Sequence, residues 1–89
     1  MDSIQCVVAG RVQGVGFRYF VLRQAQRFGI CGWVRNLENG AVELQAEGEA
    51  DSMRRFLKQV RSGPSFSHVT GVNVKEVPAE GFEGFSIVR

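Results

Sequence analysis

The chain has 89 residues, of which 44% are hydrophobic and 22% charged; these ordinary globular values exclude a disordered chain. At this length we expect one domain over residues 1–89, with a single modest core. The formal net charge of +2 is too small to indicate a nucleic-acid-binding or membrane-binding surface.

The first half of the chain carries strand and helix patterns in alternation. Residues 3–12 are rich in isoleucine and valine and predict a strand that is buried on at least one face. From Phe17 the apolar residues recur at helical spacing until Gly29, which predicts a helix that ends at this glycine. Residues 31–36 predict a second strand, and Asn39-Gly40 is a strong hairpin signal.

The second half repeats the order of the first. Residues 41–48 alternate between apolar and polar, which predicts a half-exposed third strand. A second helix follows, with Asp51 or Ser52 as its cap and Gly63-Pro64 as its end. The apolar face of this helix is formed by Met53, Phe56, Leu57 and Val60. Residues 69–77 predict a fourth strand, in which Gly71 is a candidate bulge, and residues 82–87 predict a short last strand.

The order of these elements predicts an α+β fold. Two split β-α-β units form a ferredoxin-like, two-layer sandwich, here with a short extra strand at the C-terminus. We expect an antiparallel sheet with both helices on one face. Residues 10–18 then join the first strand to the start of the first helix.

This connection holds the most unusual composition in the chain, with Gly10, Gly14 and Gly16 close together and Arg18 just after them. A strand-to-helix turn leaves backbone N–H groups unpaired, and the helix dipole adds positive charge there. Glycines let such amides curl around a phosphate. An arginine at this end opposes the dipole, so we interpret Arg18 as a phosphate ligand; the alternative is a tight structural turn with a solvated Arg18.

The turn does not match the common phosphate-binding motifs. A P-loop needs Lys-Ser or Lys-Thr after its last glycine, and here Phe17-Arg18 follows Gly16. The dinucleotide-binding fingerprint needs a third glycine where Tyr19 stands. Asn36 by itself is most simply a turn-forming residue ahead of the hairpin.

The N-terminus and the two cysteines indicate a reducing compartment. Residues 1–5 lack the basic segment and long apolar run of a signal peptide, and we expect no membrane-spanning segment. Cys6 and Cys31 have neither the number nor the spacing of a disulfide scaffold. We therefore expect a cytoplasmic protein with two reduced, mostly packed thiols, and a disulfide or redox role is the alternative.

Two segments resemble a known signature. The stretch GRVQGVGFR, residues 10–18, is similar to the first half of the acylphosphatase signature, and GWVRN, residues 32–36, followed by Gly40 and Val42, is similar to the second half. The two motifs together are highly specific. The resemblance covers the whole chain, strongly over residues 4–48 and more weakly after them. The fold of that family is the ferredoxin-like sandwich reached above from periodicity.

The resemblance implies a hydrolase that splits the carboxyl-phosphate bond of a small-molecule acyl phosphate into a carboxylate and inorganic phosphate. Arg18 and Asn36 occupy the two catalytic positions of the family, where the arginine binds the phosphoryl oxygens and the asparagine orients the attacking water. The phosphate-binding amides belong to Gln13, Gly14, Val15, Gly16, Phe17 and Arg18. A carboxylate leaving group with a pKa of about 4 departs without a proton, so no general acid is required, and we expect no metal and no other cofactor. We expect a monomer by default.

Three other functions share this topology. An RNA-binding module would need aromatic residues on the central strands, and residues 41–48 contain none. A phosphate-sensing regulatory domain would keep the glycine turn but would not need Asn36. An acylphosphatase-like part of a larger carbamoyl-transfer enzyme is the third; the chain starts just before its first predicted strand and ends just after its last, so we expect a free-standing enzyme. His68, the single histidine, and Arg11, Arg23, Arg27 and Arg35 are expected on the surface.

Overall fold

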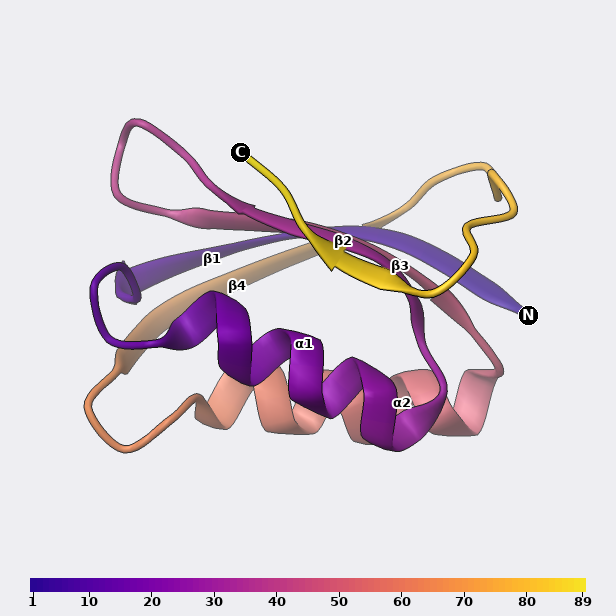
Figure 1. Cartoon of the computed structure of the whole chain (residues 1–89), viewed down its shortest axis with the longest axis horizontal. Coiled ribbons are helices and arrows are strands. Elements are labelled where there is room, and N and C mark those ends of the chain that lie inside the picture. The colour runs from indigo at the N-terminus through magenta and orange to yellow at the C-terminus, as the bar shows by residue number, and fades with distance from the viewer.

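The computed structural model describes residues 1–89 and contains two helices and five strands. The helices α1 (Phe17–Phe28) and α2 (Ala50–Ser62) lie together on one face of a single sheet (Figure 1). The strands of that sheet are β1 (Asp2–Arg11), β2 (Cys31–Asn36), β3 (Val42–Gly48), β4 (His68–Glu76) and β5 (Phe85–Ile87). Their order across the sheet is β4-β1-β3-β2-β5, and the predicted ferredoxin-like sandwich is thereby confirmed.

The sheet is mixed, whereas an antiparallel sheet was predicted. Strand β1 pairs antiparallel with both β3 and β4, and β2 pairs antiparallel with β3. Strand β5, however, runs parallel to β2, with Gly32 opposite Phe85 and Val34 opposite Ile87. The cause is the connection over residues 77–84, which reverses the chain after β4 and carries it to the far edge of the sheet. A strand antiparallel to β4 must run in the same direction as β2.

The two helices bury the faces that the sequence indicates. The buried residues of α2 are Met53, Phe56, Leu57 and Val60, as predicted. Its start differs from the prediction, because the helix begins at Ala50 after Glu49 and neither Asp51 nor Ser52 caps it; Asp51 lies inside the first turn. The helices have 12 and 13 residues, and neither is long and apolar enough to cross a membrane.

A core of 16 buried residues fills the space between the sheet and the helices. Its largest fully buried side chains include Phe17, Phe56, Leu44 and Met53. Phe17 is the first residue of α1 and follows directly on the glycine turn. Burying a phenylalanine side chain contributes about 1.5–3 kcal/mol, so Phe17 anchors the end of the turn to the core.

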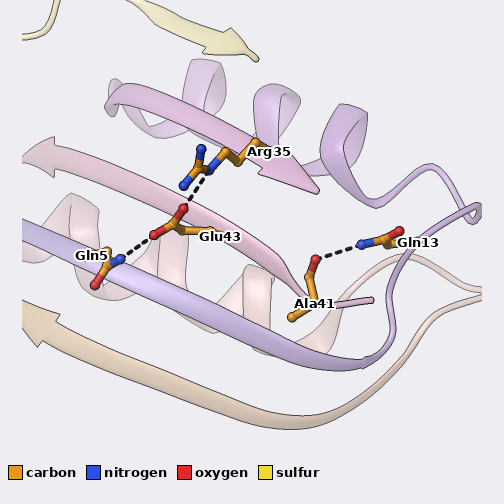
Figure 2. A network of polar contacts seen from close by, with 5 residues as sticks. All are labelled: Gln5, Gln13, Arg35, Ala41 and Glu43. Atoms are coloured by element: carbon orange, nitrogen blue, oxygen red, sulfur yellow. Dashed lines mark hydrogen bonds and ion pairs between the residues drawn. The ribbon is translucent and has the colours of Figure 1, made fainter. Parts of the chain in front are cut away.

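Strand β3 is buried on both faces, and its predicted half-exposure is wrong. Glu43 and Glu47 point away from the helices, yet they are only 9% and 4% exposed. Glu43 accepts hydrogen bonds from Gln5 on β1 and, at 2.7 Å, from Arg35 on β2 (Figure 2). Buried carboxylates need such partners, and a period-two pattern cannot reveal that polar neighbours will cover the outer face.

The segments that carry the predicted site residues gather at one end of the sheet. The connection from β1 to α1 and the hairpin between β2 and β3 lie at the same end of the molecule (Figure 1). Near this end the pairing of β1 with β4 shifts between Ala9 and Gly10. Thr70 is the extra residue on β4, beside Gly71, the glycine expected at a bulge.

Candidate active site

The turn between β1 and α1 depends on two glycines in the left-handed region. Gly14 has a φ of 73° and Gly16 a φ of 76°, a conformation that other residues adopt at a cost of roughly 1–2 kcal/mol. A Cβ atom placed on either glycine would meet nothing within 4 Å. Glycine is therefore needed here for the path of the backbone, and the space beside these residues stays open.

The backbone amides of this turn have no partner inside the chain. None of the N–H groups from residue 13 to residue 19 donates a hydrogen bond to a backbone or side-chain acceptor. Helix α1 has no side-chain cap and no acidic residue in its first turn. Successive free amides at the positive end of a helix dipole bind oxyanions. The turn thus offers a site for a phosphate or a similar anion.

Arg18 is a second unpaired group at the same place. This half-buried residue lies in the first turn of α1, and its guanidinium makes no hydrogen bond or ion pair within the chain. Arg35, expected on the surface, behaves differently: it pairs with Glu43 and stacks over the Trp33 ring at 5.4 Å. Arg18 therefore keeps its planar donor fork available for an anion.

Asn36 completes the site from the other side. It is the last residue of β2, and its Oδ1 atom is buried without a hydrogen-bond partner. A buried polar atom of this kind needs an explanation, and a donor from outside the chain supplies one. Asn36 and Arg18 line the same hollow of about 190 Å³. The structure thus brings together two residues that lie 18 positions apart in the sequence.

The predicted phosphate-binding residues divide into two groups. Gly14, Gly16, Phe17 and Arg18 line the hollow, whereas Gln13 and Val15 do not. Val15 packs against the hydrophobic core. Only the backbone amides of Gln13 and Val15 are therefore candidates for anion contact.

The side chain of Gln13 has a separate function that the sequence did not reveal. Its Nε2 donates to the carbonyl oxygens of Leu37, at 2.7 Å, and Ala41, at 2.8 Å (Figure 2 shows the second contact). These carbonyls belong to the hairpin that begins just after Asn36. Gln13 consequently fixes the glycine turn relative to the strand end that carries Asn36. No sequence signal identifies a glutamine as such a link, because the hairpin is 24 or more residues away.

Three further lining residues, Val12, Tyr19 and Ile87, were also absent from the predicted site. The position of Tyr19 near the site could have been inferred from the sequence, since Tyr19 follows Arg18 directly. Ile87 gave no signal, because its place depends on the parallel pairing of β5 with β2.

The hollow contains one cation and no acid, imidazole or thiol among its lining residues. His68 is exposed at the start of β4, and burial raises the pKa of the Cys6 thiol to about 11, so this thiol stays protonated. Cys6 and Cys31 are both free. The arrangement can bind a tetrahedral oxyanion and hold a water molecule next to it. It suits a reaction whose leaving group needs no proton.

The sequence and the fold are both similar to those of known proteins. The acylphosphatase family matches residues 4–87. An acylphosphatase from Bacillus licheniformis is 50% identical over 88 residues, which cover 98% of each chain. The crystal structure of acylphosphatase from Bacillus subtilis is 44% identical, covers both chains fully and superposes with a TM-score of 0.97. A full-length HypF structure, described as phosphate- and nucleotide-bound, is 31% identical with a TM-score of 0.88 and covers 99% of this chain but 12% of its own.

Proposed function

The chain belongs to the acylphosphatase family, whose members hydrolyse acyl phosphates, and we propose that this hydrolysis takes place in the hollow between Arg18 and Asn36. The substrate is a small molecule in which a carboxylate and a phosphate form a mixed anhydride. The observation that carries the assignment is the meeting of three unpaired groups in one hollow: the turn amides, the Arg18 guanidinium and the Asn36 amide oxygen.

The phosphoryl group is bound by the turn and by Arg18. The amides of residues 13–18 surround its non-bridging oxygens, and the Arg18 fork contacts two of them. In the loose transition state of phosphoryl transfer, charge is spread over these oxygens. Donors already fixed in place stabilise that charge without having to reorganise, which is the largest contribution that such a site can make.

The attacking water is held by Asn36. Its Oδ1 accepts a hydrogen bond from the water, which leaves a lone pair of the water oxygen free to attack phosphorus. The new P–O bond forms as the bond between phosphorus and the acyl oxygen breaks. The carboxylate leaves unprotonated, because the pKa of a carboxylic acid is about 4. A phosphate oxygen takes the proton of the water, so the reaction needs no general acid, metal ion or other cofactor.

The test is the release of carboxylate and phosphate from benzoyl phosphate, measured with a chelator present. The variants are Arg18→Ala and Asn36→Ala, with Arg27→Ala as an exposed arginine at the far end of the same helix. Removing one preorganised donor lowers kcat by roughly 100- to 1,000-fold, so we expect both site variants to lose at least about a hundredfold and Arg27→Ala to keep full activity.

Circular dichroism establishes that each variant is folded. Full activity in folded Arg18→Ala or Asn36→Ala would contradict the assigned roles, and loss of wild-type activity in the chelator would contradict a metal-free reaction. A folded wild-type protein without turnover that still binds phosphate would support the phosphate-sensing domain instead.

The open face of the sheet argues against RNA binding. On β1 and β3 this face carries Gln5, Val7, Glu43 and Gln45, which offer no aromatic ring for base stacking. Fluorescence anisotropy with labelled single-stranded RNA at low salt tests this point.

We also propose that residues 1–89 form one acylphosphatase-like domain, which acts as a cytoplasmic monomer without nucleic-acid or membrane partners. The core of 16 residues is closed within one copy of the chain, which supports the monomer. Sedimentation of the purified protein tests the oligomeric state, and fractionation of cells tests the location.

A further inference from the structure

Large apolar side chains are rarely exposed in this molecule, and the exceptions are unevenly placed. Only Met1, Tyr19, Phe66 and Ile87 are exposed, at 88%, 58%, 82% and 40%. Two of these four, Tyr19 and Ile87, line the hollow that holds Arg18 and Asn36. Exposed apolar residues that gather at a binding site point to a ligand that covers them.

We propose that Tyr19 and Ile87 form the acyl subsite of the enzyme and favour acyl phosphates with an aromatic or branched apolar acyl group. This inference rests on the proposed function of the hollow. It concerns the half of the substrate that the phosphate-binding turn cannot select, because the turn and Arg18 contact only the phosphoryl end.

The two side chains approach the substrate from different elements. Tyr19 follows Arg18 in the first turn of α1, and Ile87 ends β5, where it pairs with Val34, two residues before Asn36. The Arg23 guanidinium lies 5.9 Å from the centre of the Tyr19 ring, a contact that favours one position of this otherwise exposed ring.

The size of the hollow decides where the acyl group lies. Its volume of about 190 Å³ is below the roughly 300–1,000 Å³ of sites that enclose a drug-sized ligand. The phosphoryl group occupies the part lined by the turn, so the acyl group extends towards the exposed side chains. There an aromatic ring can stack against Tyr19 and remove apolar surface of both partners from water.

The contact affects substrate binding more than the chemical step. The acyl group keeps the same neighbours in the ground state and the transition state, so the contact lowers KM and leaves kcat unchanged. Differences of one small apolar contact change discrimination by about tenfold or more. We therefore expect a change of about tenfold in the preference between acyl groups when either side chain is removed.

The experiment measures kcat and KM for benzoyl phosphate and acetyl phosphate with the wild type, Tyr19→Ala and Ile87→Ala. Phe66→Ala is the matched control, since this phenylalanine is also exposed but does not line the hollow. The ratio of the two kcat/KM values is compared between variants, which cancels the different intrinsic reactivity of the substrates. Inhibition by inorganic phosphate reports the phosphoryl end alone.

We expect kcat/KM for benzoyl phosphate, relative to that for acetyl phosphate, to fall about tenfold in Tyr19→Ala and in Ile87→Ala, through a higher KM for benzoyl phosphate. Inhibition by phosphate should stay unchanged, and Phe66→Ala should equal the wild type. An unchanged ratio in Tyr19→Ala, whose side chain is too exposed to be needed for folding, would overturn the subsite. So would a parallel loss of phosphate inhibition. Hydrolysis of neither substrate by the folded wild type would overturn the proposed function, and the subsite with it.

Discussion

Two loops of this molecule contain consecutive backbone amides, and they differ in whether the chain itself supplies an acceptor for those amides. In the loop before β5, the N–H groups of Glu80, Gly81 and Phe82 donate to the Glu47 carboxylate at 2.5, 3.0 and 3.3 Å. In the turn before α1, the amides of residues 13–19 have no acceptor within the chain. The first loop is closed by its own side chain, and the second is left open for a ligand.

The two helix starts repeat this difference. The first turn of α2 contains Asp51, whose charge complements the helix dipole, whereas the first turn of α1 contains Arg18, whose charge opposes it. Elsewhere in the fold, polar groups with partners stabilise the structure. At the glycine turn the unpaired groups and the opposed charge lower stability, and a bound phosphate would satisfy both. What distinguishes the glycine turn is that its unpaired amides and the unpaired Arg18 lie beside one hollow, which Asn36 also lines.

The largest effect is expected when a negatively charged side chain is placed in the glycine turn before α1. Gly16→Asp places a carboxylate beside the free amides, and Gly16→Asn supplies a side chain of the same shape without the charge. Both tolerate a positive φ better than other residues. Two like charges about 4 Å apart repel by about 4 kcal/mol near a protein surface, so we expect kcat/KM of the aspartate variant to fall roughly a hundredfold or more below that of the asparagine variant.

The pair separates charge from backbone strain, because both variants share the strain. Steady-state hydrolysis of an acyl phosphate and titration with inorganic phosphate are the measurements. Equal activity in Gly16→Asp and Gly16→Asn would mean that no anion binds at this turn.

A smaller effect is expected when the open turn loses its link to the hairpin. Gln13→Ala removes two hydrogen bonds to Leu37 and Ala41 but keeps the backbone amide of residue 13. We expect kcat to fall about tenfold, since small misplacements of reacting groups are costly, while phosphate inhibition stays the same. Two hydrogen bonds also contribute about 1–2 kcal/mol to the free energy of unfolding.

Gln5→Ala is the control for this variant, because Gln5 bonds Glu43 on the outer face of the sheet, away from the hollow. Urea denaturation and steady-state kinetics distinguish the two variants. A fall in phosphate binding equal to the fall in kcat would show that Gln13 acts on the turn itself and not on the position of Asn36.

The loop of residues 80–82, whose amides bind the Glu47 carboxylate, is tested by removing the charge of Glu47. The hydrogen bond from the Glu80 amide is the main cause that lowers the pKa of Glu47 below its ordinary 4.5, against an opposing effect of burial. A carboxyl group whose pKa is lower in the folded state stabilises the fold above its unfolded pKa, and this contribution is lost as the pH falls through the folded pKa. We expect Glu47→Gln to lower Tm at pH 7 and to lose part of the acid dependence of Tm.

Thermal unfolding between pH 2.5 and 7 is the measurement, and Glu80→Gln is the control, since that side chain bonds only Gln45 on the surface. The difference between wild type and Glu47→Gln should shrink towards low pH. A constant difference across this range would contradict a role for the carboxylate charge.

The smallest effect is expected at the start of α2, where Asp51 already supplies a negative charge. In Asp51→Asn, two exposed ion pairs, with Arg54 and Arg55, are lost together with a favourable charge on the dipole of α2. Exposed pairs of this kind contribute about 0.3–0.5 kcal/mol each, so we expect a loss below about 1 kcal/mol in urea denaturation. A larger loss would mean that Asp51 caps the helix after all.

The fold could be predicted from the sequence where periodicity reports burial on one side. The four core residues of α2 and the hairpin after β2 follow from apolar spacing and from Asn39-Gly40. Burial of Glu43 and Glu47 could not be predicted, because it depends on partners from other strands and from a distant loop. The parallel β5 was missed for the same reason, since three residues carry too little pattern to choose an edge.

The residues of the candidate site likewise differ in whether a local pattern or a distant contact places them there. Arg18 and the glycines form one continuous segment, so their chemistry could be read locally as an anion site. Asn36 by itself indicated only a turn, and its proximity to Arg18 depends on the pairing of β1, β3 and β2. Gln13 and Ile87 act through contacts with segments 24 to 53 residues away, and no local pattern encodes those contacts.

The central position of β1 in the sheet affects how the chain can fold during its synthesis on the ribosome. Strand β1 is made first, yet its two neighbours, β3 and β4, are completed only at Gly48 and Glu76. Until then its hydrogen-bonding edges stay without their native partners, and the glycine turn that follows it lacks the sheet that positions it. Pairings between such distant segments also close slowly, because a long loop must be ordered first. The sheet on both sides of β1 can therefore be complete only after Glu76 has been synthesised.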